Sequence, residues 1–252
     1  MNVSTRALVR TPCPDLVNAL SEHSEALSID FDKARQQHAA YCEALKTAGV
    51  TVEALEPLDD FPDSVFIEDN AVILEGRAIL CSMKAISRQG EVLFLAEALQ
   101  SRLPILRLQP PVFIDGGDIL QTEDTVFVGQ SQRTNPEAVT ALQSLTSKLV
   151  IPLTVRQGLH LKTSVSVLGK DLLILNPSHL ETEPFREFEW IEVGEEEAYA
   201  ANCLTVGNYV ILPAGFPKLE QRIQAHGFKT LPVAMSEYQK ADGGVTCLSL
   251  FI

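Results

Sequence analysis

The sequence has no Cys-x-x-Cys pair, and its five cysteines are an odd number. These absences exclude a fully paired disulfide framework and give no support to a structural zinc site. No segment approaches the roughly 20 apolar residues that span a bilayer. The opening MNVSTRALVRTP also lacks the apolar core of a secretory signal. We therefore expect a cytoplasmic protein that does not bind a membrane.

Basic residues are scarce, since 20 Lys and Arg stand against 33 Asp and Glu and the net charge is −13. Such a balance argues against nucleic acid or an anionic surface as a partner. It suits a small cationic substrate, although a plain acidic surface explains it equally well.

The chain also lacks linkers, because no Gly/Ser tract, low-complexity segment or charge block divides it. Its 252 residues are 46% hydrophobic, which is enough for a sizeable core. We expect a single domain over residues 1–252.

Apolar runs typical of strands alternate with amphipathic runs typical of helices. The strand-like runs are 5–10, 64–74, 111–129, 161–175, 202–213 and 244–252. Turn residues such as Gly-Lys-Asp and Gly-Asn interrupt several of them, as in hairpins. The helical runs are 31–49, 88–102, 135–149 and 216–228.

The hairpin centres recur about every 40–50 residues, a period that indicates structural repeats. Helices in each repeat argue against an all-β propeller. The pattern favours five ββα-type units around an axis, with one unit shared between the two ends of the chain. An open α/β sheet remains the alternative at this point.

The chain closes on KADGGVTCLSLFI, in which Cys247 follows two glycines and enters an apolar strand-like run. A lone cysteine in such a run is more often a small buried hydrophobe than a nucleophile. A catalytic thiol needs a histidine or another cationic neighbour that favours the thiolate.

Among five histidines, His160 is the best candidate partner, because GLHLKTSVSV places it at the entry to an apolar strand. A structural histidine that caps this strand is the alternative. His23, His38 and His226 lie in polar helical patterns and are expected to be exposed, and His179 lies in a turn-like segment.

Acidic residues lie in two unusually apolar stretches: Asp63, Glu68 and Asp69 in PDSVFIED, and Asp115 and Asp118 in FIDGGD. Buried acids are costly unless a cation or hydrogen-bond donors face them. Paired carboxylates can hold the planar N–H fork of a guanidinium. Metal binding is the rival use, but no ligand spacing such as H-E-x-x-H supports it.

Two arginines complete the set. Arg133 follows a strand in VGQSQRTN, and Arg88 begins a helical run. Each is a surface arginine by default, and in an acidic pocket each could clamp a substrate carboxylate.

In this order, the stretches PDSVFIED, SRQGE, FIDGGD, FVGQSQRTN, LHLKT, EEEAYAANC, SEYQKADGG and VTCLS resemble the dimethylarginine dimethylaminohydrolases. This family belongs to the guanidine-modifying pentein superfamily, which also contains the arginine deiminases. The resemblance covers nearly the whole chain. It implies a five-bladed α/β propeller that forms a single catalytic domain, and hydrolysis of asymmetric dimethylarginine or monomethylarginine to citrulline, with no cofactor.

The resemblance also implies roles for individual residues. Cys247 matches the nucleophile and His160 the general acid and base. Asp69 matches a carboxylate that binds the guanidinium. Asp115 stands where family members carry Glu or Asp, so its reach can be shorter by one methylene.

Other positions of the family pattern bind the rest of the substrate. Asp63 and Glu68 match pocket residues, and Leu20 and Ala241 match positions that offer backbone contacts. Arg88 and Arg133 match the arginines that hold the amino-acid end. One departure is visible, because many members carry Arg-Pro-Gly-Ala where this chain has SMKA at 82–85.

Three other functions are weighed against this one. An arginine deiminase-like hydrolase would use the same residues on an unmethylated guanidine. A non-catalytic arginine-binding protein would lack the thiol or the histidine, and both are present. In a metal-regulated thiol protein, zinc on Cys247 and His160 would act as an inhibitor. The sequence leaves a homodimer open.

Overall fold

The computed structural model describes residues 6–252, which form two compact units. Unit 1 is Asp69–Asn202, and unit 2 combines residues 6–68 with 203–252. The predicted strand 5–10 begins at Thr5, which lies outside the described residues. The first residues of MNVSTRALVRTP, which are predicted not to form a secretory signal, lie outside them too. Within residues 6–252, the helices are all too short or too polar to cross a bilayer.

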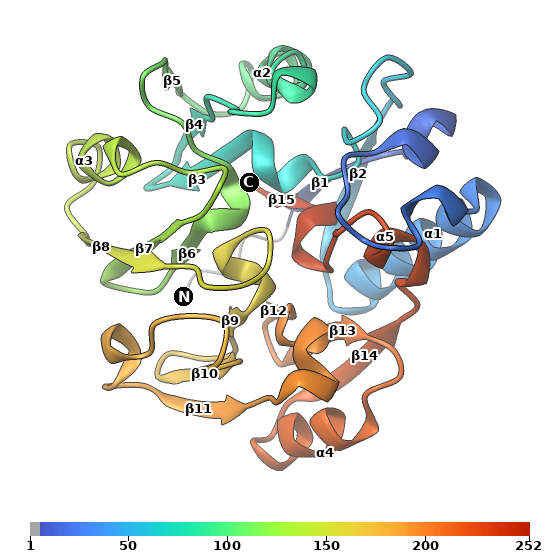
Figure 1. The fold of residues 1–252 in the computed structure, drawn as a ribbon, viewed down its shortest axis with the longest axis vertical. Coiled ribbons are helices and arrows are strands. Elements are labelled where there is room, and N and C mark those ends of the chain that lie inside the picture. Colours follow the sequence, from blue (N-terminus) through green and yellow to red (C-terminus); the bar gives the residue numbers. More distant parts are fainter. Residues whose placement is uncertain (1–5) are drawn as a thin grey trace. The chain divides into compact units, whose positions relative to one another are not determined.

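Unit 1 contains three sheets of three strands each (Figure 1). The sheet orders are β3-β4-β5, β6-β7-β8 and β11-β10-β9. Their strands are β3 (Ala71–Leu74), β4 (Arg77–Leu80), β5 (Ile105–Arg107), β6 (Ile119–Gln121), β7 (Thr125–Gln130), β8 (Leu149–Thr154), β9 (Val165–Val167), β10 (Leu172–Leu175) and β11 (Glu189–Glu192).

Unit 2 contains two more sheets, of orders β15-β1-β2 and β12-β13-β14. Their strands are β1 (Arg6–Arg10), β2 (Thr51–Leu55), β12 (Leu204–Val206), β13 (Tyr209–Pro213), β14 (Lys229–Val233) and β15 (Leu250–Phe251). The first of these sheets joins both ends of the described chain, because β15 pairs antiparallel with β1. This confirms the predicted unit that the two ends share.

Every sheet repeats one pattern: an antiparallel strand pair followed by a parallel third strand. In four sheets an α-helix leads into the third strand: α1 (Phe31–Thr47), α2 (Glu91–Leu99), α3 (Glu137–Gln143) and α4 (Pro217–Ala225). In the β9–β11 sheet a 3₁₀ turn, Glu183–Phe185, takes this place. A fifth helix, α5 (Ser236–Gln239), precedes the C-terminal segment.

Local sequence explains where these elements begin and turn. The Asp30 side chain accepts a hydrogen bond from the Lys33 N–H and so caps the start of α1. Gly207 has φ of +56° at the β12–β13 hairpin, a conformation that glycine adopts without strain.

The predicted strand runs are too long at their site-bearing ends, and this corrects the sequence interpretation. The structure has 3₁₀ turns there, ahead of the strands: Ile67–Asn70, Gly116–Asp118, Leu161–Thr163 and Thr246–Leu248. Apolar residues of these turns, such as Ile67, Leu161 and Leu248, are buried, but a strand needs a hydrogen-bonded neighbour as well. The side chains with candidate chemistry therefore lie on tight turns between strands.

One core cluster of unit 1 packs β6–β10 together. Phe127 and Phe185 lie at its centre, with ring centroids 4.7 Å apart. Burial of such rings stabilises the sheets from which the site turns emerge.

Candidate active site

His160 is buried in unit 1, and its imidazole is held by carboxylates. The Nε2 atom lies 3.1 Å from Oδ2 of Asp115, and Nδ1 lies 3.9 Å from Oδ1 of Asp69. The backbone N–H of His160 donates to Oγ1 of Thr163 at 3.3 Å, which fixes the start of the turn.

These carboxylates keep His160 protonated. Burial alone would lower the pKa of the imidazole, but Asp69, Asp118 and Asp115 outweigh it and raise this pKa to about 9. His160 is therefore an imidazolium at neutral pH and can act as a general acid.

Asp69 is held by two donors in unit 1. Its Oδ2 accepts from Nη1 of Arg88 at 2.7 Å, and its Oδ1 accepts from the Gly117 N–H at 3.1 Å. Burial would raise the pKa of Asp69, but His160 and Arg88 hold it below the ordinary value. The carboxylate is consequently ionised and suited to a cation.

Arg88 is buried rather than superficial, which corrects its default surface assignment. Its Nε and Nη2 atoms donate to Glu91 at 3.0 and 2.9 Å. Asn70 also donates to Glu91, at 2.9 Å. Glu91 was missed in the sequence reasoning, although the predicted helical run 88–102 places a residue three positions after Arg88 beside it. In the structure Arg88 ends a 3₁₀ turn, Ile86–Arg88, and Glu91 begins α2.

Gly117 leaves space for the imidazole of His160 because it has no side chain. A Cβ at this position would lie 2.7 Å from Nδ1 of His160 and 2.8 Å from Oδ1 of Asp69. Gly117 thus presents only backbone at the place where a side chain would displace the acid–imidazole pair.

We expect Gly117→Ala to lower kcat by about 100-fold, because the added methyl would push the imidazole of His160 away from its present contacts. Gly76→Ala is the control for folding, since a Cβ there meets no atom within 4 Å. Its φ of +73° strains the backbone of this variant, so the control tests for a loss of folding more severely than Gly117→Ala does. Steady-state kinetics of both variants test this expectation. Equal kcat values for Gly117→Ala and the unmodified protein would contradict it.

Two polar atoms of this cluster have no hydrogen-bond partner within residues 6–252: Oδ1 of Asp115 and Nη1 of Arg133, both buried. Nη1 of Arg133 lies 3.6 Å from Oδ2 of Asp115. A buried donor and a buried acceptor that both lack a hydrogen-bond partner suit a ligand that carries both charges. In the SMKA stretch, where the sequence differs from the family pattern, Lys84 donates to the carbonyl of Gln132, the residue before Arg133, at 2.8 Å.

Asp69, Asp115 and His160 also form a candidate cation set, since their ligand atoms lie within 4.8 Å of one another. Metal binding requires a neutral imidazole. His160 is protonated and Arg88 already neutralises Asp69. The set is therefore better suited to an organic cation than to a metal at neutral pH.

Unit 2 contains the candidate nucleophile. Cys247 is half-buried in the turn Thr246–Leu248. The Gly244 N–H donates to its Sγ at 3.4 Å, a contact that favours a thiolate. The neighbouring Thr246 hydroxyl donates to Oε2 of Glu68 at 2.7 Å.

Gly243 lies where Phe66 leaves no space for a side chain, because a Cβ would overlap the ring. The glycines of DGGVTC thus let the segment that carries Cys247 approach Phe66 closely.

Asp63, Leu20 and Ala241 also belong to unit 2. Both oxygens of Asp63 accept from the Leu20 N–H, at 3.1 and 3.3 Å. The Ala241 N–H donates to the Tyr238 carbonyl. With both N–H groups engaged, the carbonyls of Leu20 and Ala241 are the backbone groups that each position can offer.

The other four cysteines are poor nucleophiles. Burial raises the pKa of Cys13 and of Cys203, that of Cys42 to about 11, and that of Cys81 well above the ordinary value. They stay thiols at neutral pH.

Two further histidines, His38 and His179, are buried. His38 is buried, contrary to its expected exposure, because it lies on the inner face of α1, and burial lowers its pKa to about 4. His179 is buried as well, and its Nε2 lies 3.0 Å from Oε1 of Glu195.

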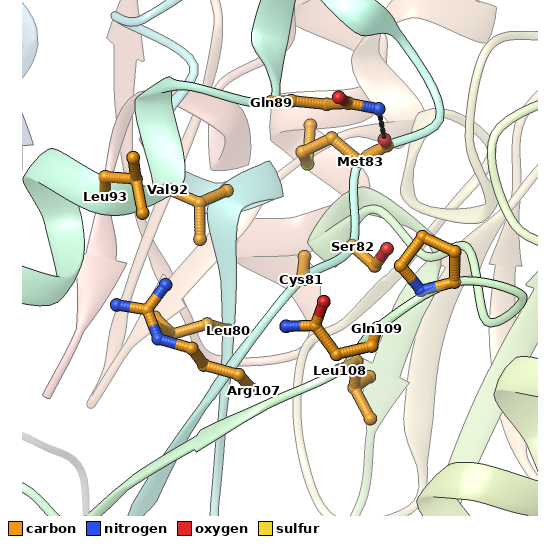
Figure 2. A pocket seen from close by; sticks show the side chains of 11 residues that line it. Leu80, Cys81, Ser82, Met83, Gln89, Val92, Leu93, Arg107, Leu108 and Gln109 are labelled. Atoms are coloured by element: carbon orange, nitrogen blue, oxygen red, sulfur yellow. Dashed lines mark hydrogen bonds between the residues drawn. The ribbon is translucent and has the colours of Figure 1, made fainter.

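Unit 1 also has a cavity of about 300 Å³ beside α2 and β5. Figure 2 shows Arg107 at its edge, and the amide of Gln89 bonded to the Met83 carbonyl. Arg107 is the charged residue in a lining otherwise apolar or neutral. Since its guanidinium would repel a cation, this cavity is not suited to the substrate that the acids indicate.

Comparison with solved structures shows which fold class the chain has. A solved structure of the Pseudomonas aeruginosa enzyme, a cysteine-to-serine mutant complexed with citrulline, superposes with a TM-score of 0.94 and 35% identity, over 99% of this chain and 100% of that one. The predicted α/β fold of five repeated units, of the pentein class, is confirmed.

Sequence comparison is equally extensive. A family model described as "N,N dimethylarginine dimethylhydrolase, eukaryotic" matches residues 15–250. The P. aeruginosa dimethylarginine dimethylaminohydrolase is 37% identical over 96% of this chain and 97% of its own length. The Streptomyces coelicolor enzyme of the same name is 34% identical, over 98% and 96%. The chain belongs to the dimethylarginine dimethylaminohydrolase family.

Proposed function

We propose that this protein hydrolyses N-omega,N-omega-dimethyl-L-arginine to L-citrulline and dimethylamine, and monomethylarginine to citrulline and methylamine. The observation that carries the proposal is the buried imidazolium of His160, 3.1 Å from Asp115, in a chain of this family. An amine is a poor leaving group until it is protonated, and this imidazolium can supply the proton.

In the first step, the Cys247 thiolate attacks the central guanidinium carbon and forms an S–C bond. The tetrahedral adduct collapses when His160 gives its proton to the dimethylamino nitrogen, and the C–N bond breaks. Dimethylamine leaves, and a trigonal thiouronium remains on Cys247.

In the second step, neutral His160 takes a proton from water, whose oxygen attacks the thiouronium carbon. The S–C bond then breaks, the thiolate is restored, and the adduct's hydroxyl becomes the C=O of citrulline as its proton passes to solvent, where the released dimethylamine takes it up. No oxidant, reductant or cofactor enters this sequence.

Asp69 and Asp115 are proposed to bind the guanidinium and to stabilise its charge. Glu68, in unit 2, is proposed to bind the guanidinium as well. It accepts from the Thr246 hydroxyl next to Cys247, and it directly precedes Asp69 in the chain. Asp63 is proposed to act on the pocket through Leu20.

For the amino-acid end, Nη1 of Arg133 supports its role as carboxylate anchor, because it is a buried donor with no hydrogen-bond partner within residues 6–252. The contacts of Arg88 with Asp69 and Glu91 support a role in orienting Asp69, and its contact with the substrate stays a prediction. The carbonyls of Leu20 and Ala241 are proposed to accept from the substrate ammonium group.

Four wider properties stay predictions: one catalytic domain over 1–252, a homodimer, a cytoplasmic location and inhibition by zinc. Five free cysteines support a reducing compartment. For zinc on Cys247 and His160, the raised pKa of His160 means that the metal must displace a proton, so inhibition is expected to strengthen as pH rises.

The direct test is citrulline release from dimethylarginine, monomethylarginine and arginine in parallel. We expect turnover of the methylated substrates. Turnover of arginine alone would assign the chain to deiminase chemistry, and turnover of none by folded, metal-free protein would refute the substrate assignment.

A pH profile tests the role of His160. Because its pKa is raised to about 9, the acid form is present at neutral pH and is lost as pH rises through that value. We expect kcat/KM to fall above about pH 9, with a slope of one proton. A profile that keeps rising well above pH 9 would contradict this assignment.

A further inference from the structure

Asp118 is a fully buried acid to which the proposed mechanism gives no part. Its Oδ2 accepts from the Ser131 hydroxyl and from the Thr134 hydroxyl, each at 2.6 Å. Its Oδ1 accepts from the Leu161 N–H at 2.9 Å. One carboxylate thereby joins the loop after β7 to the turn after His160.

The direction of these hydrogen bonds is fixed by their surroundings. Oγ of Ser131 accepts from the N–H groups of Arg133 and Thr134, at 3.0 and 3.3 Å. Oγ1 of Thr134 accepts from the Asp115 N–H at 3.2 Å. Both hydroxyls therefore donate to Asp118, and with the Leu161 N–H they give it three donors. These donors favour the ionised carboxylate and oppose burial, whose larger effect raises the pKa of Asp118 above its ordinary value.

Each arm of this network ends beside a residue of the proposed mechanism. Leu161 follows His160 directly, Ser131 holds the backbone of Arg133, and Thr134 holds the backbone of Asp115. The general acid, its carboxylate partner and the substrate anchor thus share one buried centre.

Strand β7 leaves room for that centre. A Cβ on Gly129 would lie 2.6 Å from Oδ1 of Asp118 and 2.7 Å from Cβ of Leu161. The strand thus passes Asp118 with bare backbone where any side chain would displace the carboxylate from the Leu161 N–H.

We propose that Asp118 is a positioning residue that fixes His160, Asp115 and Arg133 relative to one another. This inference rests on the proposed function insofar as those three residues carry it. Asp118 also acts through space, because its charge is among those that raise the pKa of His160.

Asp118→Asn is the principal variant. The amide places an N–H where the carboxylate accepts, either toward the two hydroxyls or toward the Leu161 N–H, so at least one arm is lost. The control is Asp124→Asn, the same substitution at an exposed position of the β6–β7 turn.

The expected result in Asp118→Asn is a kcat lower by about 10- to 100-fold, together with a raised KM. The pKa of His160, measured by NMR of its ring nitrogens and assigned with His160→Gln, is expected to fall. Asp124→Asn should match the unmodified protein in all three quantities. A lowered Tm with unchanged kcat, KM and His160 pKa would overturn the proposal, since a merely structural acid behaves in this way.

Ser131→Ala keeps the carboxylate and the Leu161 arm and removes the hydroxyl that accepts from the N–H groups of Arg133 and Thr134, so it remains informative where Asp118→Asn does not fold. It should raise KM several-fold with a smaller loss of kcat, because Arg133 binds while His160 reacts. An unchanged KM in Ser131→Ala would overturn the proposed link to Arg133.

The NMR measurement also separates this inference from the proposed function. An unmodified protein that releases no citrulline, together with a lowered His160 pKa in Asp118→Asn, would refute the function and leave the positioning role intact. Normal citrulline release with an unaltered His160 pKa and normal kinetics in Asp118→Asn would do the reverse.

Discussion

Replacing Cys247 by serine is expected to abolish citrulline release, with a loss on the order of 10⁴-fold or more. A serine hydroxyl is not ionised at neutral pH, and the Gly244 N–H that faces Sγ cannot make it so. The other cysteines cannot replace Cys247, because burial raises the pKa of each of them. Citrulline release from dimethylarginine measures the effect.

Cys42→Ser is the matched control, since Cys42 is also a half-buried cysteine of unit 2 and its thiol has a pKa of about 11. It should retain activity within about twofold, as substitutions away from the site usually do. Cys247→Ser should still bind dimethylarginine in a calorimetric titration. Residual turnover above a hundredth of the original rate would refute Cys247 as the nucleophile.

Replacing His160 by glutamine is expected to lower kcat for dimethylarginine by about 10²- to 10⁴-fold, the usual contribution of a positioned general acid. Glutamine can still contact Asp115 but cannot transfer a proton. The loss should be much smaller with S-methyl-L-thiocitrulline, because a thiolate leaves without prior protonation. Comparison of the two substrates, with His226→Gln as an exposed histidine control, measures the acid role.

The same fractional loss on both substrates would contradict general-acid catalysis. It would indicate that His160 serves to bind substrate or to favour the thiolate, since both of these roles are needed whichever group leaves.

The repeat period and the helical runs predicted an α/β fold of repeated units and favoured five of them, which the five sheets confirm. They did not exclude an open α/β sheet, and the resemblance to a family supplied the five-bladed propeller. The run 31–49 became α1 (Phe31–Thr47), and the Gly-Asn turn became the β12–β13 hairpin, because caps and turn residues act locally. The extended structure predicted around FIDGGD was wrong. Gly116–Asp118 form a 3₁₀ turn behind the buried Ile114, and hydrophobic pattern alone does not distinguish that burial from a strand.

The site was predictable by residue type but not by pairing. Apolar surroundings marked Asp69, Asp115 and His160 as unusual, and their contacts in unit 1 agree with that reading. Nothing local could show that Arg88 would bond to Asp69, 19 residues away, or that Asp118 would bond to a backbone N–H 43 residues away. Such partners are chosen by tertiary packing.

The most direct test of the account is mass spectrometry of protein quenched in acid during turnover. The account predicts one adduct, on the peptide that contains Cys247, with the same mass from dimethylarginine and from monomethylarginine, because both lose their amine before water attacks. An adduct that retains the methylated amine, or one on another residue, would contradict the thiouronium mechanism. Rapid citrulline release with no adduct at any quench time would contradict it equally.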